Sequence, residues 1–66
     1  MHLTVNGKPF TVLEPPSVET LVQRLTAARR GVAVAVNGTV VPRSAWADVP
    51  LAEGDAVEVL TAAQGG

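Results

Sequence analysis

The chain has 66 residues, of which 47% are hydrophobic and 17% charged, with a formal net charge of −1 and no cysteine. A chain of this length forms one small domain, which buries only about 60% of the surface that its unfolded form exposes. The lack of cysteine excludes disulfides and thiol nucleophiles, and the weak negative charge argues against nucleic-acid binding through phosphates. No apolar run reaches the ~20 residues that span a bilayer, and no signal peptide is recognisable. We therefore expect a cytoplasmic protein.

The first predicted element is a β-hairpin. Apolar and polar residues alternate from Met1 to Val5, and Asn6-Gly7 follows. This dipeptide supplies the positive φ angles that a two-residue type I′ turn requires. The turn fixes a register that pairs Leu3 with Phe10. Pro9 cannot donate a ladder hydrogen bond, so we expect the second strand at an edge of the sheet.

An amphipathic helix is predicted from Val18 to Arg30. Ser17 precedes it as an N-cap, and Gly31 follows it as the expected C-cap. Apolar residues recur at helical spacing on one face, namely Val18, Leu21, Val22, Leu25 and Ala28. We expect Leu25 to be buried beneath this helix, over the last strand of the chain.

Three further strands are predicted after the helix. The stretch 32–36 alternates valine and alanine, and valine suits a pleated sheet. Both of its faces are apolar, so the pattern leaves open which face meets the helix. Asn37-Gly38 predicts a second hairpin leading to strand 39–41. The last strand is predicted over 56–60, with Val57 and Val59 on one face.

The loop between the last two strands carries Arg43 and Trp46. Burial of the large ring would anchor the loop, whereas an exposed ring would be an interface hot spot. Arg43 can either cap the loop or pair with an acidic partner. The sequence leaves these alternatives open.

The order of elements is therefore ββαβββ. It predicts an α+β fold in which a mixed sheet of about five strands is covered on one face by one main helix. This is the order of the β-grasp, or ubiquitin-like, fold, whose last strand lies at the sheet centre beside the first. We divide the chain into a β-grasp domain, residues 1–60, and a flexible tail, residues 61–66, that ends in Gly-Gly.

Catalytic machinery is not recognisable in the sequence. His2 is the only histidine, and we expect it on the polar face of the first strand. Ser17 and Ser44 therefore lack a general base, and the carboxylates are scattered rather than clustered as metal ligands. We predict a protein that is not an enzyme and that binds no metal and no stable cofactor.

The most distinctive chemical group is the terminal carboxylate of Gly66. Because glycine has no Cβ, Gly65 and Gly66 can pass through a slot too narrow for other residues. We expect the whole tail to enter the active sites of partner proteins, and its residues are Thr61, Ala62, Ala63, Gln64, Gly65 and Gly66.

Several segments together resemble the ThiS family, the sulfur carriers of thiamin thiazole biosynthesis. They are Val34-Ala35-Val36-Asn37-Gly38, Val41-Pro42-Arg43-Ser44, Trp46, Leu51, Gly54-Asp55, Val57-Glu58-Val59 and Gly65-Gly66. The similarity runs over nearly the whole chain. Its most specific part is the segment from Val36 to Trp46.

The resemblance implies that a ThiF-type adenylating enzyme activates Gly66 with ATP. A persulfide donor would then convert it to a thiocarboxylate, and a ThiG-type thiazole synthase would receive the sulfur. A terminal diglycine also fits MoaD-like carriers of molybdopterin synthesis, carriers for cysteine synthesis and ubiquitin-like modifiers. Chain length and the Trp46 loop favour the thiazole carrier over these alternatives and over a purely non-covalent binding module.

Overall fold

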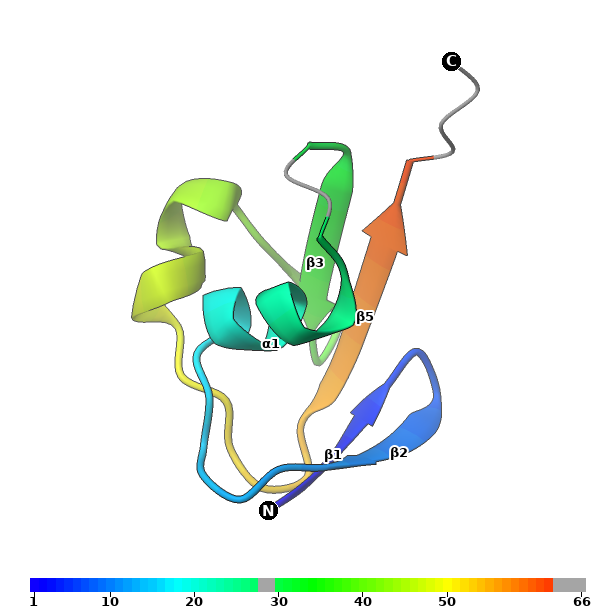
Figure 1. Ribbon diagram of the computed structural model, residues 1–66, viewed down its shortest axis with the longest axis vertical. Coiled ribbons are helices and arrows are strands. Elements are labelled where there is room, and N and C mark those ends of the chain that lie inside the picture. Colours follow the sequence, from blue (N-terminus) through cyan, green and yellow to red (C-terminus); the bar gives the residue numbers. More distant parts are fainter. Residues whose placement is uncertain (28–29, 63–66) are drawn as a thin grey trace.

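The computed structural model describes residues 1–27 and 30–62 of the chain. The strands form one five-stranded sheet in the order β2-β1-β5-β3-β4, and the helix α1 lies across one face of it (Figure 1). The predicted α+β class and the β-grasp order ββαβββ are confirmed. In chain order the elements are β1 (His2–Val5), β2 (Lys8–Thr11), α1 (Val18–Leu25), β3 (Val32–Val36), β4 (Thr39–Val41), the 3-10 helix η1 (Arg43–Asp48) and β5 (Ala56–Thr61).

Both Asn-Gly dipeptides form the predicted tight turns. Asn6 and Gly7 have φ angles of 52° and 80°, and Asn37 and Gly38 have 51° and 83°. The first turn pairs Leu3 with Phe10, as its length predicts, and β2 lies at the edge of the sheet. The turn chemistry therefore determines the register of both hairpins.

β5 occupies the centre of the sheet. It runs parallel to β1, where Val5 lies beside Val57, and antiparallel to β3, where Val34 lies beside Val59. Val34 is buried and Ala33 is exposed, so the valine face of β3 meets the helix. This observation decides the alternative that the sequence left open.

The core lies between the sheet and α1. Its helical members are Val18, Leu21 and Val22, and Ser17 caps the helix by accepting a hydrogen bond from the Thr20 amide at 3.2 Å. The buried apolar cluster consists of Leu3, Val5, Val12, Val18, Leu21, Val22, Val34, Val41, Trp46, Leu51, Val57 and Val59.

The helix is shorter than predicted, which corrects two expectations. It ends at Leu25, and its C-cap is Thr26 rather than Gly31. Thr26 takes extended backbone angles (φ −153°, ψ 148°), in keeping with the weak helix preference of a β-branched residue. Leu25 therefore sits at the open end of the helix and is 36% exposed, so the prediction that it is buried is wrong. Ala28 and the residue after it lie outside the described residues.

The Trp46 loop is structural. η1 buries the Trp46 ring, and its indole Nε1 donates a hydrogen bond of 2.9 Å to the buried carbonyl of Val41. The Arg43 guanidinium lies over the ring, 5.6 Å from its centroid, within the range of a cation–π contact. Both residues therefore hold the loop against the end of β4. Within the described residues, no helix is long and apolar enough to cross a membrane.

Candidate functional site at the end of the central strand

The predicted tail continues from the central strand of the sheet. β5 runs to Thr61, one residue further than predicted, and Thr61 pairs with Val32 of β3. In Figure 1 the chain leaves β5 at one end of the molecule, away from the chain start. Of the six predicted tail residues, Thr61 and Ala62 are described and are exposed. Residues 63–66, which include Gly66, lie outside the described residues.

The Asn6 side chain holds β5 beyond the end of β1. Its Oδ1 accepts a hydrogen bond from the Val59 amide at 2.8 Å, and its Nδ2 donates to the Val59 carbonyl at 3.0 Å. The Asn6 side chain thus makes the hydrogen bonds to β5 that one further residue of β1 would make. Sequence reasoning assigned Asn6 only to the turn, and this second role was missed.

The second Asn-Gly turn holds the beginning of the same strand. Asn37 Oδ1 accepts from the Ala56 amide at 3.0 Å, and Asn37 Nδ2 donates to Asp55 Oδ1 at 3.0 Å. The Asn37 backbone amide also donates to the Ala56 carbonyl at 2.7 Å. Both turns therefore fix β5, one near each end.

A contact with Gly31 holds the first residue after β5. The Ala62 amide donates to the Gly31 carbonyl at 2.6 Å. Because successive backbone amides of a strand point to opposite sides, the amide of Val59 faces Asn6 and the amide of Ala62 faces β3. Among the described residues, Thr61 and Ala62 are therefore held from the β3 side. No sequence pattern indicated this contact, since Gly31 was interpreted as a helix cap.

The outer face of the sheet next to this point carries exposed apolar side chains beside the carboxylate of Glu58, which is exposed and pairs with Ala35. Leu60 is 67% exposed and Val40 is 73% exposed. Between them in the sheet lie Ala33, which pairs with Leu60, and Ala35, which pairs with Val40. Strand alternation requires Leu60 to face away from the helix, because Val57 and Val59 face it.

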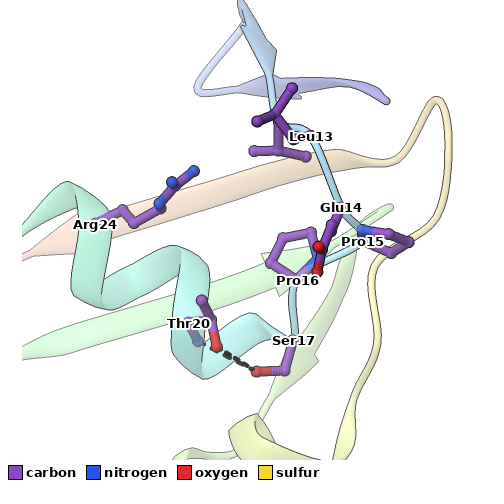
Figure 2. Close-up of a pocket in the computed structure, with 8 residues that line it drawn as sticks. Leu13, Glu14, Pro15, Pro16, Ser17, Thr20 and Arg24 are labelled. Atoms are coloured by element: carbon purple, nitrogen blue, oxygen red, sulfur yellow. Dashed lines mark hydrogen bonds between the residues drawn. The ribbon is translucent and has the colours of Figure 1, made fainter.

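A hollow of about 440 Å³ lies at the start of α1. Figure 2 shows that Leu13, Pro15 and Pro16 form one wall and that Arg24 extends over it from the helix. The hydroxyl groups of Ser17 and Thr20, which line the hollow, lie 3.1 Å apart and are occupied in capping the helix. The described residues that line the hollow all lie between Val12 and Arg24, so we assign it to the helix start and not to the tail.

Other chemically interesting residues are dispersed. His2 is exposed on β1, as predicted, and its Nδ1 lies 3.4 Å from Thr11 Oγ1. Ser17 caps α1, whereas Ser44 is exposed in η1. In residues 1–27 and 30–62, no group of three or more histidine or carboxylate side chains could hold a metal ion. The structure brings none of these residues to the end of β5.

Comparison with known proteins identifies the family. Residues 3–66 match the ThiS family. The chain belongs to the ThiS family. The match includes the Asn-Gly turn of residues 37–38, the Trp46 loop and the Gly-Gly end. The recognition made from the sequence is therefore confirmed.

Two solved structures of a family member are similar over the entire chain. Both describe a thiamine biosynthesis protein from Geobacter metallireducens, named ThiS in the crystal structure, that is 43% identical to this chain. The crystal structure has a TM-score of 0.82 with full coverage of both chains. The solution structure has a TM-score of 0.85 and is covered over 88% of its length. An uncharacterized protein, ycf40, from Porphyra purpurea is 30% identical over the whole chain and 93% of its own length.

Proposed function

We propose that this protein is a sulfur carrier in the synthesis of the thiazole part of thiamin. The observation that carries the proposal is the point in the fold from which the tail continues. A Gly-Gly sequence follows the central strand of a β-grasp sheet in a chain that belongs to the ThiS family. The two similar solved structures, which are of a thiamine biosynthesis protein, support the same pathway.

In the proposed mechanism the Gly66 carboxylate is the reacting group. A ThiF-type enzyme transfers AMP from ATP to this carboxylate and releases pyrophosphate. A persulfide sulfur then attacks the acyl-adenylate and displaces AMP. A thiol cleaves the resulting sulfur–sulfur bond, which leaves a thiocarboxylate on Gly66. A ThiG-type thiazole synthase receives this sulfur.

The residues of the chain fit the role of a carrier rather than of an enzyme. The chain contains no cysteine, so a persulfide or thioester cannot form on one of its own side chains. The C-terminal carboxyl group is the remaining place at which it could carry sulfur covalently. ATP is a substrate of the partner, and we expect no stably bound cofactor and a cytoplasmic location.

The partner enzymes must accommodate both the tail and the surface beside it. We infer that the ThiF-type enzyme contacts the outer face formed by Ala33, Ala35, Val40 and Leu60, because Leu60 lies two residues before Ala62 on the strand that carries the tail. Exposed apolar side chains that gather on one face are typical of protein interaction surfaces.

The decisive experiment measures the species at the C-terminus. The protein is produced together with a ThiF-type enzyme and a persulfide donor, and its intact mass is recorded. We expect a fraction that is heavier by the difference between sulfur and oxygen, located in the C-terminal peptide. Gly66→Phe should abolish this fraction while the domain stays folded.

The same measurement distinguishes the modifier from the carrier. A ubiquitin-like modifier would form isopeptide conjugates between Gly66 and lysine side chains of other proteins. Finding such conjugates without any sulfur-bearing form would refute the carrier function. A MoaD-like carrier would form the thiocarboxylate but would fail to supply sulfur to a thiazole synthase.

A further inference from the structure

Gly31 makes an unusually close approach to the residue from which the tail continues. It lies directly before β3, with a φ angle of +70°, and its carbonyl accepts the Ala62 amide at 2.6 Å. A Cβ atom built on Gly31 would lie 2.9 Å from the Ala62 Cβ. Real Cβ atoms do not approach another atom this closely, so a side chain at this position would displace Ala62.

Three other glycines provide an internal comparison. Gly7, Gly38 and Gly54 have φ angles of +80°, +83° and +85°, and a Cβ on any of them would meet nothing within 4 Å. These three positions need glycine for the backbone angle alone. Gly31 has a second requirement, which is the space that Ala62 occupies.

We propose that Gly31 is a positioning residue for the activation of Gly66. It holds Ala62 in line with β5 and thereby fixes the point from which the last four residues continue. This role rests on the proposed function as a sulfur carrier. Gly31, in the turn before β3, therefore takes part in tail delivery. Its position shortly after the helix does not indicate this role.

The contact between Gly31 and Ala62 affects how far the chain end can reach and how tightly a partner binds. The four residues after Ala62 can span at most about 13–14 Å when extended. A residue that is already ordered in the free protein need not be ordered when a partner binds. Ordering one residue on binding lowers the binding constant by a factor of about 5–30. Losing the contact at Ala62 should therefore weaken productive docking by about that factor.

Three variants of the full chain test the proposal. Gly31→Ala introduces the clash with Ala62. The double variant Gly31→Ala/Ala62→Gly removes the clashing Cβ, because the remaining neighbours, the Ala62 nitrogen and Cα, lie 3.7 and 3.9 Å away. Gly38→Ala is the matched control, since it introduces the same kind of backbone strain with no atom within 4 Å.

The first readout is independent of any partner. Amide exchange and the ¹⁵N heteronuclear NOE of residue 62 should show an ordered amide in the wild type. Gly31→Ala should make this amide exchange faster and lower its NOE. The double variant should recover both values, and Gly38→Ala should leave them unchanged. An unchanged amide in Gly31→Ala would refute the positioning contact.

The second readout is adenylation of the chain by a purified ThiF-type enzyme with ATP. Because the contact holds Ala62 before binding, Gly31→Ala should raise the KM for the carrier about 5- to 30-fold and leave kcat within about twofold. An equal rise in KM for Gly38→Ala would assign the effect to general strain and overturn the proposal. If the wild type is not adenylated at all, the proposed function fails and the role in activation fails with it. The exchange experiment still decides whether the contact exists.

Discussion

Leu21 should be the most sensitive position of the helix. Its side chain has 0% exposure and lies in the core between α1 and the sheet. Leu21→Ala removes three buried carbon atoms, which corresponds to about 2.4 kcal/mol at ~0.8 kcal/mol per carbon. The cavity that remains raises the total to about 3–5 kcal/mol. Domains of this size have a free energy of unfolding near 5 kcal/mol or less, so Leu21→Ala should retain at most about 2 kcal/mol of stability or fail to fold.

Leu25→Ala provides the matched control in the same helix. Leu25 is 36% exposed, so the substitution loses about two thirds of the transfer free energy given for Leu21, roughly 1.5 kcal/mol. The site opens to solvent, so no cavity remains. Urea unfolding followed by circular dichroism measures the free energy of unfolding of Leu25→Ala and of any Leu21→Ala that folds, and the absence of a transition in Leu21→Ala counts as complete loss of stability. Equal destabilisation by the two substitutions, or a larger loss for Leu25→Ala, would refute the assignment of the buried helix face.

Three further variants test the loop, the tail and the central strand. Trp46→Phe should cost about 1–3 kcal/mol in chemical denaturation, because the buried Val41 carbonyl loses the indole donor; an unchanged midpoint would contradict this. Deletion of Gly65 and Gly66 should leave Tm nearly unchanged, because the core lies within residues 3–59; a fall of many degrees would show that the tail packs on the domain. Asn6→Gly keeps the positive φ angle but removes both hydrogen bonds to Val59. It should lower the free energy of unfolding by about 1–2 kcal/mol and increase amide exchange at Val59, which hydrogen-exchange NMR measures.

Local chemistry was sufficient to predict the hairpins and the edge position of β2. Asn-Gly turns need positive φ at both central positions, and that requirement determined register without knowledge of the rest of the fold. The placement of β2 at the edge followed from Pro9, which cannot donate a ladder hydrogen bond. These features depend on residues close together in the chain, so the sequence displays them directly.

The length of the helix and the role of Gly31 depend on residues far apart in the chain. The apolar stripe continued to Leu25 and beyond, and the following alanines and arginines favour helix. The structure nevertheless ends α1 at Leu25. Gly31 looked like a C-cap, but its conformation serves the approach to Ala62, which lies 31 residues later. No local pattern indicates such a contact, because a glycine that caps a helix and a glycine that allows a close approach are the same residue in the sequence.

The arrangement around β5 fits the proposed role of the chain end, because the strand before it is held firmly. β5 is hydrogen-bonded on the β3 side along its whole length, and on the β1 side the strand and the Asn6 amide hold it as far as Val59. Its inward residues Val57 and Val59 are part of the core. The outward Leu60 adds little to that core, since it is 67% exposed. Leu60→Glu should therefore leave the free energy of unfolding almost unchanged. It should weaken adenylation by the ThiF-type enzyme, because a carboxylate would be buried in an apolar contact. If adenylation proceeds with the wild-type KM, the enzyme does not use this face, and tail recognition alone must account for docking.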